Sequence, residues 1–149
     1  MVASAHMSVV TARVAGVKRI IFASTGWVTD SGVVVTDHES GYPYYLIAKE
    51  RYDEVQKPWP MITHESPLRP IGLYGCAKIW GEALGRHYSD GHHLSVIIVR
   101  IGAVTPEDRP MLPRQWPIWC SHRDIAQLIQ RCVEAPDSIR FGTFFGVSN

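Results

Sequence analysis

The sequence lacks the features that mark disulfide-rich, membrane-spanning and secreted proteins. Its 149 residues include three cysteines, Cys76, Cys120 and Cys132, whose spacing suggests no disulfide framework. The longest apolar runs are no longer than a β-strand, and no basic segment followed by a long apolar one opens the chain. These absences predict a cytoplasmic protein without disulfides.

The sequence also lacks an excess of charge of either sign. Its net charge is +1 and no basic stripe carries interleaved aromatics, so neither nucleic acid nor a membrane surface is an expected partner. Seven histidines are present, but no H-x-x-x-H or C-x-x-C group predicts a metal site, and no G-x-S-x-G turn predicts a serine hydrolase. The 46% hydrophobic content indicates a single domain over residues 1–149.

What the sequence does contain is a Tyr-x-x-x-Lys pair, Tyr74 and Lys78, within a helix expected from about Gly72 to His87. Residues four apart share one helix face. A phenol ionises near pH ~10, so it serves as an acid or base at neutral pH only when a cation favours its anion. Lys78 is the candidate cation. The spacing alone is weak, because it recurs by chance in many helices.

An apolar segment upstream, residues 17–26, ends in Ser24, Thr25 and Gly26 and predicts a buried strand with hydroxyls at its carboxyl end. In open parallel sheets, ligands bind outside the carboxyl ends of the strands. Ser24 or Thr25 would therefore face the crevice that the Tyr74 helix borders.

Together these segments resemble the extended short-chain dehydrogenase/reductase superfamily, in its NAD-dependent epimerase/dehydratase branch. Within that branch they are most similar to dehydrogenases of the uronate dehydrogenase type. The resemblance rests on Ala15–Thr25, Arg69-Pro70, Leu73–Lys78, Gly81-Glu82-Ala83, Leu94–Gly102 and Arg123–Ala126. It implies an α/β fold, a partial Rossmann-like, doubly wound and mainly parallel sheet.

The resemblance also implies NAD or NADP as cofactor and hydride transfer at a hydroxyl of a sugar or sugar acid. Tyr74 would exchange the hydroxyl proton, Lys78 would support its anion and hold the cofactor ribose, and Thr25 would bind the substrate oxygen. Further cofactor-binding residues implied by the resemblance are Ser24 and the loop of Gly102, Ala103 and Val104.

The chain departs from this family in two ways. It contains no G-x-x-G-x-x-G turn between a strand and a helix, and no acidic residue placed to hold the ribose, so we expect a truncated domain that lacks its first strands and is inactive alone. It also carries an insertion at about residues 30–70, rich in tyrosine and proline. Such a long loop is either a wall of the substrate pocket or a surface excursion.

Several residues keep two interpretations. Arg123, after the expected N-cap Ser121, binds either a substrate carboxylate or a neighbouring acid such as Asp124, and the ion pair is favoured. Arg100 has the same two interpretations. An apolar stripe on the tyrosine helix predicts packing, and the resemblance implies a homodimer through residues 72–88. The stripe consists of Leu73, Ala77, Trp80, Leu84 and Tyr88.

Two other functions remain open. The chain could be a non-catalytic remnant that dimerises or binds another protein, as the lack of a phosphate-binding turn allows. Alternatively, it could derive from a nucleotide-sugar epimerase or dehydratase that uses the same three residues. Fold resemblance does not choose among these substrates.

Overall fold

Three parallel strands form the centre of the computed structural model, which describes residues 2–26, 43–58, 61–70 and 72–148. The strands are β1 (Arg19–Thr25), β2 (Ser95–Ile101) and β3 (Phe141–Gly146), in the order β1-β2-β3. Thr25 pairs with Ile101, and Ile101 pairs with Gly146, so the three strands end at one level. The expected α/β class with a parallel sheet is confirmed.

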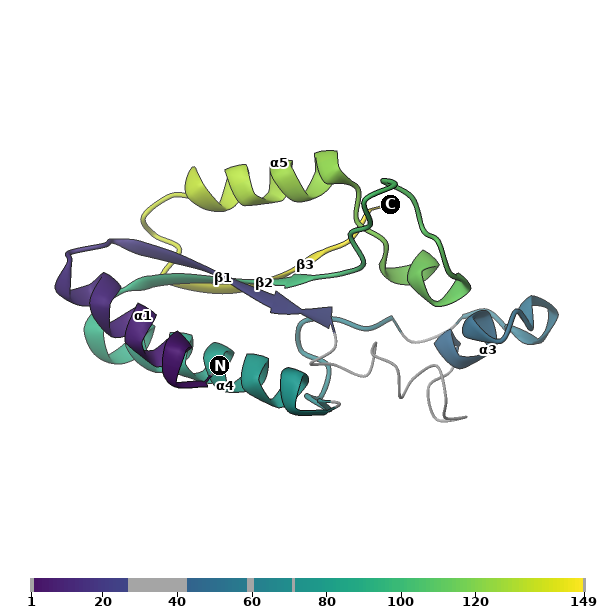
Figure 1. Cartoon of the computed structure of the whole chain (residues 1–149), viewed down its shortest axis with the longest axis horizontal. Coiled ribbons are helices and arrows are strands. Elements are labelled where there is room, and N and C mark those ends of the chain that lie inside the picture. The colour runs from purple at the N-terminus through teal and green to yellow at the C-terminus, as the bar shows by residue number, and fades with distance from the viewer. Residues whose placement is uncertain (1, 27–42, 59–60, 71, 149) are drawn as a thin grey trace.

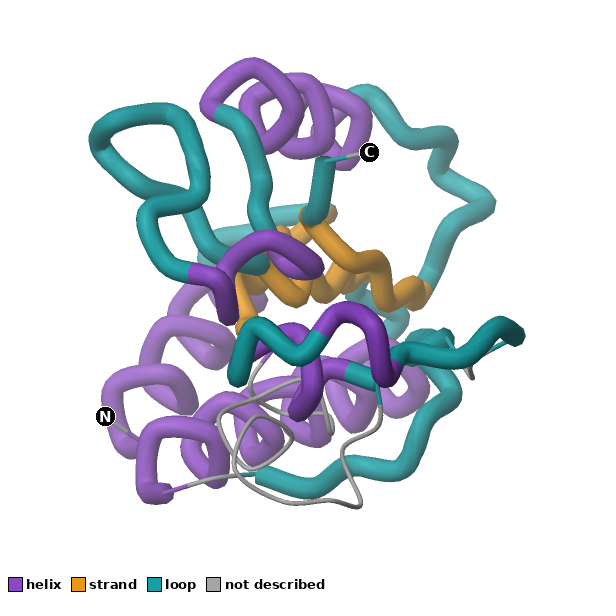
Figure 2. Tube along the Cα trace, turned by 90° about the vertical axis from the view of Figure 1, so that its right-hand side faces the viewer, coloured by secondary structure: helices purple, strands orange, loops and turns teal. Residues whose placement is uncertain are grey.

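Helices cover both faces of this sheet (Figures 1 and 2). α1 (Val2–Val14) and α4 (Gly72–His92) lie on one face, and α5 (His122–Val133) lies on the other. Side chains of β2 alternate between the two: Val96 and Ile98 pack with α1 and α4, whereas Ile97 and Val99 pack with α5. A central strand buried on both faces explains the continuous apolar run in its sequence.

Short elements gather where the strands end. α3 (Tyr44–Ala48) and η4 (Pro113–Ile118) lie in contact with each other beyond the carboxyl ends of the strands, and η3 (Tyr52–Glu54) follows α3 (Figure 1). α3 and η3 belong to the expected insertion, of which residues 30–42 and 59–60 lie outside the described residues. Within the described part of the chain, no helix has the length and apolar character needed to cross a membrane.

Glycine determines how closely α4 approaches the sheet. A Cβ on Gly81 would lie 2.3 Å from Cζ of Phe22, and a Cβ on Gly85 would lie 2.9 Å from Cγ1 of Val96. The glycine side of α4 therefore faces the sheet. Within the single chain the first half of the apolar stripe is not packed, because Leu73 is 89% exposed and Trp80 is 36% exposed.

The second half of the stripe does pack as predicted. Leu84 and Tyr88 join the core cluster that includes Val9 of α1. α1 thus covers the C-terminal half of the stripe and leaves the N-terminal half exposed. The helix itself extends beyond the predicted end at His87, to His92.

The start of α5 confirms the predicted N-cap at Ser121. Ser121 Oγ accepts a hydrogen bond from the backbone N–H of Asp124 at 3.0 Å, as an N-cap does. The Asp124 carboxylate does not return to the backbone of Ser121. It accepts hydrogen bonds from Ser148 Oγ at 2.5 Å and Arg123 Nε at 3.0 Å, and these partners hold the pKa of Asp124 below its usual range.

Candidate active site

The first two turns of α4 carry Tyr74 and Lys78 to the carboxyl end of β1. Gly72 begins the helix with a φ of +64°, a conformation that suits glycine. Lys78 Nζ donates a hydrogen bond to the carbonyl oxygen of Ala23 at 2.6 Å and lies 5.5 Å from the centroid of the Tyr74 ring. Tyr74 is 48% exposed, so its ring lies beside an ammonium group and remains open to a ligand.

The two hydroxyl residues that end β1 are both buried, and they have different surroundings. Ser24 Oγ donates a hydrogen bond to Glu82 Oε1 at 2.5 Å, across to α4. Side chains alternate along a strand, so Thr25 projects from the opposite face of β1. Ser24 is therefore bound to a carboxylate of α4, whereas Thr25 ends the strand next to Gly26, on the face of the sheet that α5 covers.

A buried ion pair joins α4 to the end of β2. Arg100 Nε and Nη2 donate to Glu82 Oε1 at 3.1 Å and to Glu82 Oε2 at 2.7 Å. The Arg100 and Glu82 side chains are 4% and 9% exposed. Arg100 also donates to the carbonyl oxygen of His64 at 3.3 Å. Of its two interpretations, the structural ion pair is therefore the one that the structure shows.

Glu82 is the residue of this site that sequence reasoning did not single out. It follows Lys78 by four residues and Tyr74 by eight, and so shares their helix face. The sequence did contain a feature that could have identified Glu82. It is a carboxylate on the same helix face as the candidate base Tyr74, and it stands among glycines. Its contacts to Ser24 and Arg100 fix the position of α4 relative to both strand ends.

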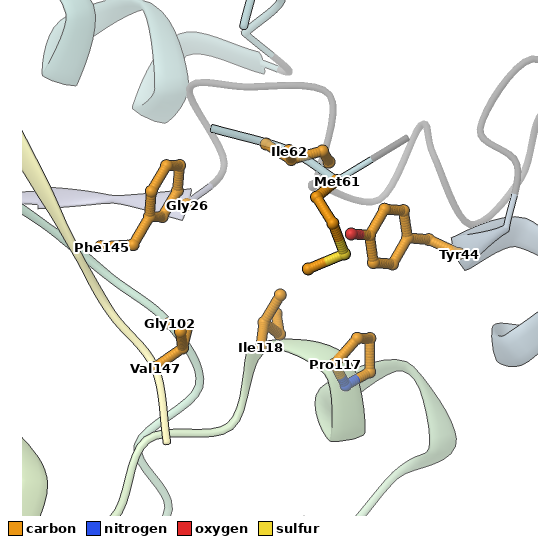
Figure 3. A pocket seen from close by; sticks show the side chains of 9 residues that line it. All are labelled: Gly26, Tyr44, Met61, Ile62, Gly102, Pro117, Ile118, Phe145 and Val147. Atoms are coloured by element: carbon orange, nitrogen blue, oxygen red, sulfur yellow. The ribbon is translucent and has the colours of Figure 1, made fainter. Parts of the chain in front are cut away.

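A pocket of about 120 Å³ opens beyond the ends of all three strands (Figure 3). Gly26 and Gly102, which follow β1 and β2, line it. A Cβ on Gly102 would lie 2.0 Å from the carbonyl oxygen of Ile118, so a side chain does not fit here. Tyr44, Met61 and Ile62 form another wall. The described part of the insertion therefore contributes a wall to this pocket.

The other predicted site residues are not among the described residues that line this pocket. Ala103 N donates to the carbonyl oxygen of Ile118 at 2.7 Å, and Val104 is 42% exposed. The Arg123 side chain is 88% exposed and pairs with Asp124. Tyr74, Lys78 and Thr25 border the end of β1 and are not among the described lining residues. Among the described residues, no group of three or more histidine, cysteine, aspartate or glutamate side chains is placed to hold a metal ion.

No family model matches the chain, but comparison with known proteins identifies related sequences and structures. Uronate dehydrogenase of Agrobacterium fabrum is 35% identical over 125 residues, which are 84% of this chain and 37% of that protein. L-arabinose 1-dehydrogenase (NAD(P)(+)) of Haloferax volcanii is 31% identical over 135 residues, covering 83% of this chain and 48% of that protein.

A solved structure, a mutated uronate dehydrogenase, superimposes with a TM-score of 0.76 at 30% identity, over 99% of this chain and 44% of that one. The chain belongs to the short-chain dehydrogenase/reductase superfamily. It spans less than half the length of the uronate and arabinose dehydrogenases it matches. Within the superfamily, these relatives are dehydrogenases of sugars and sugar acids, as their names state.

Proposed function

We propose that this chain carries the proton-transfer half of an NAD(P)-dependent dehydrogenase that acts on a hydroxyl group of a sugar or sugar acid. The observation that carries the proposal is the position of Lys78. Its ammonium group lies beside the Tyr74 ring and on the carbonyl of Ala23, two residues before Thr25. The relatives named above supply the substrate class and the cofactor.

In this mechanism a hydroxyl at the end of β1, assigned to Thr25 by the resemblance alone, would hydrogen-bond the reacting oxygen and so orient the substrate hydroxyl. Tyr74 Oη takes the proton of that hydroxyl as the alcohol is oxidised. Lys78 favours the phenolate through its positive charge. Glu82 and Arg100 hold α4 against the ends of β1 and β2, so that these groups keep their relative positions.

The residues present fit one end of the cofactor. Lys78 Nζ, which donates to the carbonyl oxygen of Ala23, would hold the ribose hydroxyls through its other N–H groups. The oxidised nicotinamide accepts the hydride when bound. The sequence holds no glycine-rich turn for the pyrophosphate. We therefore propose that another polypeptide segment supplies it and that these 149 residues alone are inactive.

The proposal is tested by adding a segment that could provide the missing pyrophosphate site. The chain should be titrated with NAD and NADP by calorimetry, alone and after co-expression with the N-terminal segment of the Agrobacterium fabrum relative that this chain does not match. We expect affinity weaker than about 1 mM for the chain alone, and glucuronate- or arabinose-dependent NADH formation in the complemented sample.

Tyr74→Phe should abolish this turnover and leave cofactor binding in place, whereas Lys78→Met should weaken both. Turnover retained by Tyr74→Phe would remove the phenol from the mechanism. Tight NAD binding by the unaided chain would instead show that a pyrophosphate site exists within it.

We further propose that the chain forms a homodimer through residues 72–88 of α4. The exposed half of the apolar stripe, Leu73 and Trp80, supports this assembly, because a second copy would cover it. The same surface would serve a non-catalytic dimerising module. The complementation experiment separates these two functions, because only the catalytic one requires Tyr74.

A further inference from the structure

The pocket beyond the strand ends differs in chemistry from the site of proton transfer. Six of its described lining side chains are hydrocarbon or thioether groups, namely Met61, Ile62, Pro117, Ile118, Phe145 and Val147. Among the described lining residues none is charged, and the only polar side-chain group is the hydroxyl of Tyr44, which points toward the cavity in Figure 3. The described lining of the pocket is therefore apolar apart from one hydroxyl.

Backbone groups at its floor are already engaged. Gly102 N donates to the carbonyl oxygen of Gly146 at 2.9 Å, and the carbonyl oxygen of Ile118 accepts from Ala103 N at 2.7 Å. From the described lining, a carboxylate placed here would gain neither a cation nor these donors in exchange for its lost water, and burial of an unpaired charge is strongly unfavourable. Arg100, the nearest buried cation in sequence to Gly102, is already paired with Glu82.

The size of the pocket limits the group it can accept. An apolar cavity of about 150 Å³ holds a benzene molecule, so about 120 Å³ suits one hydrocarbon ring or a short branched chain that partly reaches the open mouth. A whole sugar with its hydroxyls would leave most of them without partners in this lining. Only part of a substrate therefore fits.

We propose that this pocket binds an apolar substituent of the substrate, about one hydrocarbon ring in size, while the reacting hydroxyl lies at Thr25 and Tyr74. The substrate is then an alcohol or sugar derivative with an alicyclic, aryl or branched alkyl group, and the Tyr44 hydroxyl contacts a single oxygen on that group. This inference rests on the proposed function for the reacting hydroxyl and extends it to substrate class.

The test uses the chain itself with ¹³C-labelled methyl groups and two probes, cyclohexanol and D-glucuronate. Cyclohexanol should shift the methyl signals of Met61, Ile62 and Ile118 in a saturable manner, and glucuronate should bind there at least about tenfold more weakly. Equal or stronger effects of glucuronate on these methyls, or no effect of cyclohexanol, would overturn the proposal.

A charge placed at the rim provides a second measurement. Met61 is 68% exposed, so Met61→Lys should fold and should weaken cyclohexanol binding at least about tenfold. Met111→Lys is the matched control, because Met111 is 48% exposed and is not among the lining residues. Equal effects of the two variants would contradict the proposal. Failure of the complemented chain to use NAD(P) would overturn the proposed dehydrogenase and leave these shifts unchanged.

Discussion

Glu82 and Arg100 show how a single buried pair organises the candidate site. Both side chains are almost fully removed from water, and Glu82 also accepts the Ser24 hydroxyl hydrogen bond. Removing two charges from water is unfavourable unless each keeps its partner. The position of α4 relative to the ends of β1 and β2 therefore depends on this pair, because Glu82 binds Ser24 of β1 and Arg100 of β2.

Loss of either partner should destabilise the chain strongly. Glu82→Gln or Arg100→Met leaves one charge buried without its partner, and we expect a loss of about 3–5 kcal/mol in the free energy of unfolding. The double variant Glu82→Leu/Arg100→Met should recover most of that loss. Urea unfolding measures all three, with Arg86→Ala as control, because its pair with Asp90 is more than half exposed. Additive effects in the double variant would show that the pair has no coupling.

Asp124 gives a prediction that depends on pH. Its folded-state pKa is lowered, first by the Ser148 hydroxyl and then by Arg123 and Ser121. The charged carboxylate therefore adds stability above the unfolded-state pKa of about 3.9, and this stability is lost as the pH falls through the lower folded-state pKa. Asp124→Asn should lower the melting temperature at neutral pH, and the difference should shrink as the pH falls below about 4.

Thermal melts between about pH 3 and 7 measure this difference. Asp137→Asn is the surface control, because that side chain is fully exposed. A difference between Asp124→Asn and the native chain that stays constant with pH would assign the effect to packing and not to charge.

At the scale of secondary structure, the glycine face of α4 gives the sharpest contrast between two similar substitutions. Gly81→Ala places a methyl group against the Phe22 ring, and we expect a loss of about 1–3 kcal/mol in the free energy of unfolding. Gly91→Ala meets nothing within 4 Å in the same helix, so it should stabilise by about 0.5–1 kcal/mol. Chemical denaturation compares the two.

Phe22→Leu should relieve part of the Gly81→Ala loss, because a shorter side chain makes room for the new methyl group. If Gly81→Ala and Gly91→Ala have the same effect, helix propensity and not the close approach of α4 to the sheet controls stability here.

The sequence predicted these elements well where side-chain pattern and burial agree. The apolar runs that became β1 and β2, and the Ser121 cap of α5, were predicted because strand hydrophobicity and N-cap chemistry are local properties. The orientation of α4 was not. A stripe of Leu73 and Trp80 is indistinguishable in sequence from a core stripe, and the deciding factor was the space that Gly81 and Gly85 leave at the sheet.

At the scale of the whole molecule, the topology contains a feature that no local pattern encodes. The chain steps from β1 to β2 and then to β3 in one direction, yet α4 and α5 lie on opposite faces (Figure 1). The two connections therefore have opposite hands, and one is left-handed, against the strong preference for right-handed crossovers. The superfamily resemblance predicted the sheet, but spacing and periodicity could not predict this arrangement.

The exposed half of the α4 stripe makes the assembly of the molecule testable. If two copies meet through residues 72–88, Trp80→Lys should place a charge in a desolvated interface and weaken the dimer at least about tenfold, as measured by sedimentation equilibrium. Trp116→Lys is the matched control, since Trp116 is 62% exposed on η4, away from α4. Dissociation by Trp116→Lys but not by Trp80→Lys would place the interface at η4, and a chain that is monomeric at every concentration would exclude the dimer.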